Sequence, residues 1–202
     1  ERPTVLFITS FGQAALVLPY LEKEKLAEGE LELQAFTYED DPANWGGAFR
    51  EAIEALGLAQ AKLAAEPSRL RLLELQFIQA AAPNAAIIDG SPIVEGLRLK
   101  KDTQELAKMR EVAVIAQKAL VDTLKHIHPG MSEKQIAAEL VIALYQAGSD
   151  IELPFEPIVS SGPNSANPHA APSERLLQEG DLLLVDWGAS KDGNFSDIPR
   201  TD

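Results

Sequence analysis

Two apolar, strand-like segments separated by the dipeptide Asp192-Gly193 limit the fold of this chain more than any other feature of its sequence. An Asp-Gly pair between apolar segments predicts a tight β-hairpin, because the favoured two-residue turn needs positive φ at both central positions. Counting outward from that turn places Gly188 opposite Asp197. Asp186 then lies on the same face as Asp197, as its diagonal neighbour at a backbone distance of about 7–8 Å.

The two aspartates are unusual in such a hairpin, since a carboxylate that is buried without a partner is costly. Two converging carboxylates can share one divalent cation, or hold two cations about 3.5–4 Å apart. The spacing of Asp186 and Asp197 leaves two interpretations open. One is a metal site, and the other is an ordinary hairpin whose acidic side chains point into water.

The composition is that of a globular protein, with 46% hydrophobic and 24% charged residues. A length of 202 residues allows one large domain or two small ones. No apolar segment reaches the length of about 18 residues that spans a bilayer. No secretory signal is visible, although the first residue is Glu1 and not Met, which leaves a removed N-terminal segment open. We expect a cytoplasmic protein with no membrane partner.

The sequence contains no cysteine, which excludes disulfides, thiolate nucleophiles and Cys-ligated zinc. Its 18 basic and 31 acidic residues give a formal net charge of −13. This charge disfavours nucleic acid as a partner, because binding to phosphates needs a basic surface. A net charge of this size favours solubility, and it leaves open the alternative of a basic protein partner.

The first part of the chain, up to about residue 90, alternates short apolar segments with helical patterns and predicts an α/β arrangement. The first two strands are expected to form a hairpin. This part contains no histidine and no glycine-rich phosphate loop. The expected strands cover residues 4–9, 14–19, 31–38, 61–65 and 86–88, and the expected helices cover residues 19–28, 45–56 and 68–80.

Residues 91–101 are expected to connect this part to a second region, which begins with two helices. The pairs Asp102 with Glu105 and Ser132 with Gln135 have the spacing of capping boxes and predict the first turns of those helices. Their expected ends are at residues 128–130 and at Gly148. The elements expected after them are a strand over 155–160, a turn over 162–164 and a loop over 167–172.

His169 is the histidine that the sequence singles out. It lies in a loop stiffened by Pro168 and Pro172, shortly before the hairpin with the two aspartates. A histidine in a loop is commonly just a solvated side chain, and that interpretation stays open beside a role in a site. His126 and His128 follow a helix, where the helix dipole favours a cation without any chemistry.

The run from Phe155 to Thr201 resembles the first half of the catalytic domain of the pita-bread metallopeptidases, which include methionine aminopeptidase, prolidase and aminopeptidase P. The residues before it resemble the N-terminal domain of the prolidase and aminopeptidase P branch. The resemblance implies a partial α/β N-terminal domain of the creatinase/prolidase type over residues 1–92, then the first half of an α+β pita-bread domain over residues 93–202. The matching pieces are Pro157-Ile158-Val159-Ser160-Ser161-Gly162-Pro163-Asn164, Pro168-His169, Glu179-Gly180-Asp181, Val185-Asp186-Trp187-Gly188 and Ser196-Asp197-Ile198-Pro199-Arg200-Thr201.

The resemblance also implies roles for individual residues. Asp186 would be a ligand of one of two divalent metal ions, and Asp197 would bridge both. His169 would be the catalytic histidine beside the substrate. Arg200 would support the two metal-binding carboxylates without binding the metal itself. The ions would be manganese, cobalt or zinc, and they would activate a water that cleaves the bond before proline in peptides with proline at the second position. The family further implies a homodimer.

Departures from the family pattern qualify these expectations. The family uses three more ligands, a histidine and two glutamates, which follow the hairpin, so little activity is expected of these 202 residues alone. The first part of the N-terminal domain is also expected to be missing. Phe195 stands where tyrosine is common, and Pro199 stands where threonine is usual. Since proline cannot donate to a sheet ladder, Pro199 predicts an edge strand or a bulge.

Two other functions fit the same fold. One is a non-catalytic pita-bread module that binds protein, as related domains of some histone chaperones do. The other is a metal-free hydrolase similar to creatinase. The pair Asp186 and Asp197 favours the metallopeptidase over both, because a protein that binds no metal has no use for two converging buried acids.

Overall fold

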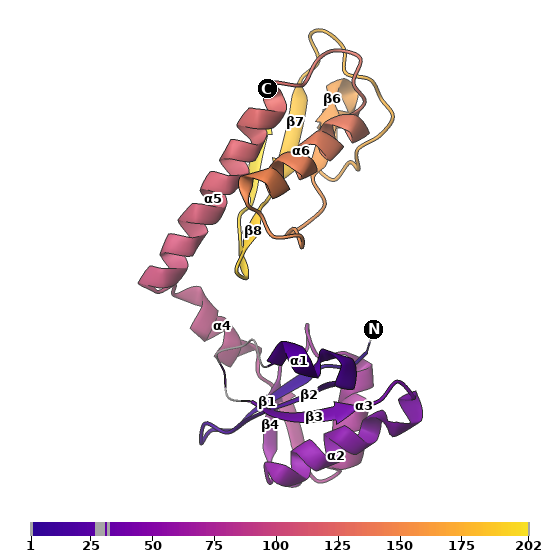
Figure 1. Cartoon of the computed structure of the whole chain (residues 1–202), viewed down its shortest axis with the longest axis vertical. Coiled ribbons are helices and arrows are strands. Elements are labelled where there is room, and N and C mark those ends of the chain that lie inside the picture. Colours follow the sequence, from indigo (N-terminus) through magenta and orange to yellow (C-terminus); the bar gives the residue numbers. More distant parts are fainter. Residues whose placement is uncertain (1, 27–30, 32, 202) are drawn as a thin grey trace. The chain divides into compact units, whose positions relative to one another are not determined.

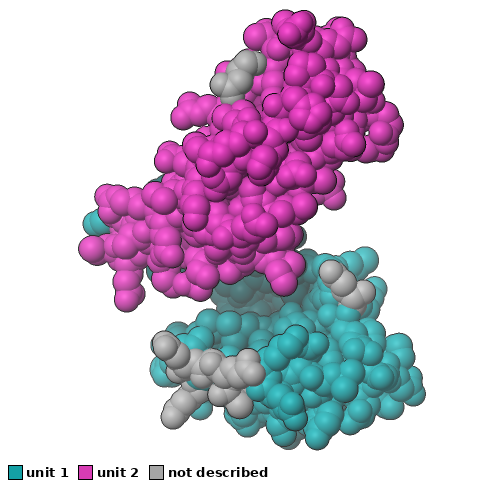
Figure 2. Space-filling view, turned by 45° about the horizontal axis from the view of Figure 1, so that its top comes forward, with its two compact units in different colours: residues 1–100 teal, residues 101–202 magenta. Residues whose placement is uncertain are grey.

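The computed structural model describes residues 2–26, 31 and 33–201 (Figure 1). It divides the chain into two compact units, residues 1–100 and 101–202 (Figure 2). The sequence predicted the division after Pro92, with a connector over residues 91–101. Most of these connecting residues form a helix, α4 (Ser91–Leu99), whose second residue is proline and whose preceding Asp89 accepts a hydrogen bond from the Ser91 N–H at 2.8 Å.

The first unit contains a three-stranded sheet of order β1-β2-β3. Strands β1 (Val5–Ile8) and β2 (Ala14–Pro19) pair antiparallel, which confirms the predicted hairpin. Strand β3 (Gln34–Tyr38) pairs with β2 in parallel and begins later than the strand predicted over residues 31–38. A separate parallel pair is formed by β4 (Lys62–Ala65) and β5 (Ala86–Asp89).

Helices α2 and α3 of this unit form one core together with its strands. Helix α2 (Trp45–Ala55) buries Phe49 and Ile53 beside Val17 of β2, and α3 (Leu72–Ala81) contributes Ile78. The helix predicted over residues 19–28 is described as η1 (Tyr20–Glu22) and α1 (Lys23–Leu26), and its last two residues lie outside the described residues. A further short turn, η2 (Pro42–Asn44), leads into α2.

Two helices form one layer of the second unit, α5 (Thr103–Leu124) and α6 (Glu133–Ala147). Both predicted capping boxes are confirmed, by Asp102 with Glu105 and by Ser132 with Gln135. Gly148 ends α6 with a φ of 107°, a left-handed conformation that favours glycine. Helix α5 ends before the predicted position at residues 128–130.

The other layer is an antiparallel sheet of order β10-β7-β6, formed by β6 (Ile158–Ser161), β7 (Leu183–Trp187) and β10 (Ile198–Thr201). A short turn, η3 (Gly162–Ala166), follows β6, and the hairpin is completed by β8 (Ser190–Lys191) and β9 (Asn194–Phe195). The core lies between the sheet and the two helices. It contains Val112, Ala116, Leu140, Leu144, Val159, Val185 and Trp187, each 1% exposed or less.

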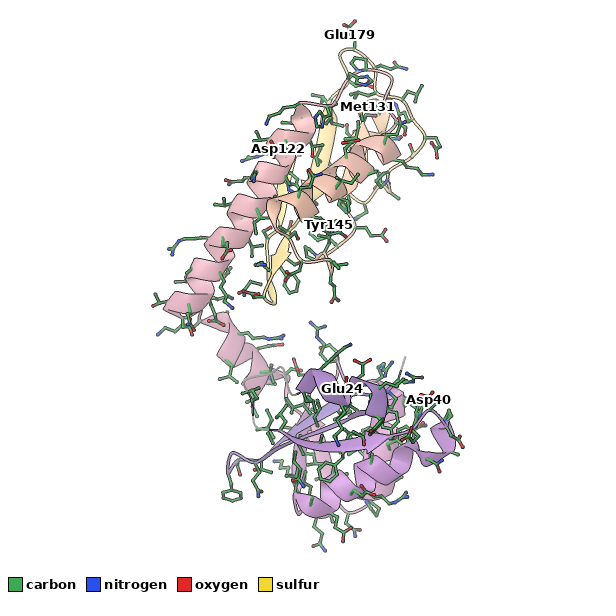
Figure 3. The ribbon with its side chains drawn as sticks, viewed as in Figure 1. Glu24, Asp40, Asp122, Met131, Tyr145 and Glu179 are labelled. Carbon is green, nitrogen blue, oxygen red and sulfur yellow. The ribbon has the colours of Figure 1, made fainter. Side chains whose placement is uncertain are left out.

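The surface carries much of the acidic charge. Glu24, Asp40 and Glu179 are exposed and lie on the outside of their units (Figure 3). Within the described residues, no helix is both long enough and apolar enough to cross a membrane. A few acidic groups are buried and not exposed to solvent. Two of these groups, the Glu133 side chain and the Asp186 Oδ1 atom, belong to the second unit.

Candidate metal site

The predicted hairpin register is confirmed by the pairing of its strands. Asp192 and Gly193 both have positive φ, of 48° and 72°, and Lys191 pairs with Asn194. The same register continues between β7 and β10, where Asp186 pairs with Pro199. No residue is inserted between the turn and this pair, so Asp186 and Asp197 keep the diagonal relation that the sequence predicted.

The strands approach each other closely just beside the two aspartates. A Cβ atom on Gly188 would overlap the Ser196 carbonyl oxygen and a side-chain carbon of Pro154. Two hydrogen bonds between Ser196 and Ala189 hold the two segments together here. The Ser196 N–H donates to the Ala189 carbonyl at 3.0 Å, and the Ser196 Oγ accepts from the Ala189 N–H at 2.9 Å. The tight backbone contact fixes the position from which Asp197 projects.

Asp186 is a half-buried carboxylate with an unsatisfied oxygen. Its Oδ1 is buried and has no hydrogen-bond partner among the described residues. Burial raises the pKa of Asp186, and so do the negative charge of Asp197 and a hydrogen bond between the two side chains. The charge of His169 lowers the pKa of Asp186. A buried acceptor beside a second carboxylate is the arrangement that a cation would satisfy.

Asp197 and Pro199 lie at an edge of the site. Strand β10 is one of the two outer strands of the three-stranded sheet in the described part of the chain, which confirms the edge position predicted from Pro199. Asp197 is exposed, just before β10, so the expectation that both acids are buried is wrong for Asp197. Arg200 pairs with Val185 and therefore lies one residue out of phase with Asp186, on the other face of the sheet. The resemblance implied that Arg200 supports the two carboxylates, whereas the register places Arg200 on the opposite face of the sheet from Asp186.

His169 lies in the loop after η3, and its side chain is exposed. Its N–H donates to Asn167 Oδ1 at 3.1 Å, which makes a local turn in the loop. The loop is nevertheless close enough to β7 for the charge of His169 to act on Asp186. Asp197 and His169, the two other residues selected from the sequence, thus each act electrostatically on Asp186.

The described residues contain no group of three or more His, Cys, Asp or Glu side chains arranged to hold a metal ion. What they offer is two carboxylates, one of them with a buried free oxygen, and a histidine nearby. Carboxylate oxygens are ligands that hard divalent cations prefer. These residues fit part of a site for such an ion, with His169 outside the set of ligands.

Glu133 was not recognised from the sequence. The motif around it indicated a helix cap, which Ser132 and Gln135 form, while the Glu133 side chain turns inward and is fully buried. It accepts hydrogen bonds from residues on both sides of the His169 loop, Ser161 and Ser173. The spacing of those partners is not periodic, so no local pattern could have identified them.

The two units match two protein-family models. Residues 1–100 match the Creatinase/Prolidase N-terminal domain, and residues 107–201 match Metallopeptidase family M24. The chain therefore belongs to the M24 metallopeptidases that carry a creatinase-type N-terminal domain, and it contains that domain and part of the catalytic one. This confirms the resemblance drawn from residues 155–201 and the predicted fold class.

Individual relatives agree with the family. The chain is 28% identical over 202 residues to a Xaa-Pro dipeptidase of Lactobacillus helveticus, covering 100% of this chain and 55% of that one. It is 30% identical over 205 residues to a probable dipeptidase PepE of Mycobacterium tuberculosis, of which it covers 52%. The crystal structure of a prolidase from Thermococcus sibiricus superposes with a TM-score of 0.86 at 29% identity, over 100% of this chain and 54% of that one. The chain thus spans about half the length of the curated relatives it matches.

Proposed function

We propose that this chain is the part of a Xaa-Pro peptidase that supplies Asp186 and Asp197 to a divalent metal site. The proposal is supported most directly by the buried Oδ1 of Asp186, which lacks a partner in the described residues and lies beside a second carboxylate. The related dipeptidases and prolidases make a peptide the substrate class. The predicted homodimer and cytoplasmic location stay predictions.

Three residues have proposed roles in the reaction. Asp186 and Asp197 would hold the ion, which when bound would supply an activated water and polarise the scissile carbonyl. Water adds to that carbonyl, the bond to the proline nitrogen breaks, and the nitrogen takes up a proton. We propose that His169, which is exposed and whose charge acts on Asp186, donates a hydrogen bond to the carbonyl oxygen as charge develops on it.

Metal removal tests this function. The full-length protein, assayed with a peptide that has proline second, is expected to lose activity in a chelator and to regain it with manganese. The reason is that the carboxylates hold the ion but cannot activate water themselves. The same peptide with alanine at the second position serves as the control for substrate class. Undiminished hydrolysis after complete metal removal, or equal rates with both peptides, would contradict the proposal.

A further inference from the structure

One fully buried carboxylate in the second unit binds both ends of a single chain segment. Glu133 is the first residue of α6 and is 0% exposed. Its Oε1 accepts from the Ser161 N–H at 2.7 Å and the Ser161 hydroxyl at 3.0 Å, while its Oε2 accepts from the Ser173 N–H at 3.0 Å and the Ser173 hydroxyl at 2.6 Å. The Asn164 amide donates to both oxygens, at 3.1 and 3.2 Å.

The segment between these partners is the one that carries His169. Ser161 is the last residue of β6, Asn164 lies in η3, and Ser173 comes just after the loop over residues 167–172. One oxygen of Glu133 therefore holds the start of the segment and the other holds its end. The middle of the segment, where His169 lies, is exposed.

An ion pair extends this network toward the strand that carries Asp186. Arg175 donates to the Ser161 hydroxyl at 2.6 Å and pairs with Asp181 at 2.6 Å. Asp181 also accepts from the Gln178 N–H at 2.9 Å, in the turn that leads into β7. The network thus joins the N-terminus of α6, the end of β6, the His169 segment and the approach to β7.

The chemistry of the network requires a carboxylate at position 133. Burial alone would raise the pKa of Glu133, but the hydrogen bonds from Ser173, Ser161 and Asn164 outweigh burial and lower it. An ionised carboxylate only accepts hydrogen bonds, which suits a ring of donors. A glutamine amide would direct its own N–H groups at the backbone N–H of Ser161 or Ser173.

We propose that Glu133 is a positioning residue, which clamps residues 161–173 at both ends and so holds His169 toward Asp186 and Asp197. The inference rests on the proposed function for its consequence in catalysis, while the clamp itself is a property of the fold. It assigns to a buried helix residue a role that is exerted only through the loop.

Kinetics of the full-length protein test the consequence. Glu133→Gln is expected to lower kcat per folded molecule by about 10–100-fold, with a smaller change in KM, because a displacement of about 1 Å can cost that much. The matched control is Glu139→Gln, on the same helix but with its side chain 44% exposed. In a His169→Ala background, Glu133→Gln is expected to cause no further loss. An equal additional loss in that background, or a Glu133→Gln enzyme that behaves like Glu139→Gln, would overturn the proposal.

Hydrogen exchange tests the clamp without any activity. In Glu133→Gln, the amides of residues 164–171 are expected to exchange at least about tenfold faster, with α5 unchanged, whereas Glu139→Gln leaves both unchanged. If Glu133→Gln does not fold, Ser173→Ala removes one donor and loosens only the far end. Unchanged exchange in the segment, or equal acceleration across the whole unit, would overturn the clamp. An inactive wild type would refute the proposed function alone, since the exchange result still decides the clamp.

Discussion

Replacing Asp197 by asparagine in the full-length protein is expected to lower kcat/KM for a peptide with proline second by more than about a hundredfold. Loss of a group that merely supports a metal ligand typically costs 10–100-fold, and loss of the ligand itself costs more. Asparagine keeps the shape of the side chain but removes the negative charge next to Asp186. Steady-state rates at saturating manganese, normalised to folded protein, measure the effect.

Asp192→Asn is the matched control, because it makes the same substitution in the same hairpin. Asp192 has a φ of 48°, a conformation that asparagine also tolerates, and its contact with Lys108 at 3.5 Å is exposed. We expect near wild-type rates for this variant. If Asp197→Asn and Asp192→Asn were equally active, Asp197 would have no part in the reaction.

The largest effect on stability is expected at Trp187, the large aromatic side chain in the core of the second unit. Trp187 is 0% exposed, and its indole N–H donates to the Ala116 carbonyl of α5 at 3.0 Å. Trp187→Ala leaves a cavity and removes this hydrogen bond between β7 and α5, and should lower the free energy of unfolding by about 3–5 kcal/mol. Urea unfolding followed by far-UV circular dichroism measures the loss in the transition of this unit.

Phe195→Ala provides the comparison for that experiment, since Phe195 is an aromatic residue of the same hairpin but is 53% exposed. Its loss should cost no more than about 1 kcal/mol. Because Trp187 follows Asp186 directly on β7, Trp187→Ala is also expected to reduce activity before the protein unfolds. A Trp187→Ala protein as stable as Phe195→Ala would show that the core is not built around this contact.

The parts of the fold that could be predicted from sequence are those governed by short-range rules. The Asp192-Gly193 turn set the register of the hairpin, since the turn type leaves one way to pair the flanking residues. The capping boxes at Asp102 and Ser132 began both helices where predicted, because each satisfies its own backbone N–H groups locally. Pro199 at an edge strand follows from its missing N–H.

The rest depends on contacts between distant residues. Helix α4 lies where a connector was expected, although Pro92 at its start is a helix signal in hindsight. Glu133 accepts hydrogen bonds from Ser161 and Ser173, which are 28 and 40 residues away in the sequence. The helical pattern around Glu133 therefore could not predict these partners. The position of Arg200 on the opposite face from Asp186 depends on a register that the resemblance to the family did not take into account.

Manganese binding to the full-length protein is the most direct test of the central claim that Asp186 and Asp197 hold a metal ion. Isothermal titration calorimetry would compare the wild type with Asp186→Asn and with Asp192→Asn. We predict that Asp186→Asn weakens binding by more than about tenfold, since it removes a ligand and not merely its support, while Asp192→Asn binds like the wild type. Wild-type affinity and stoichiometry in Asp186→Asn would contradict the claim.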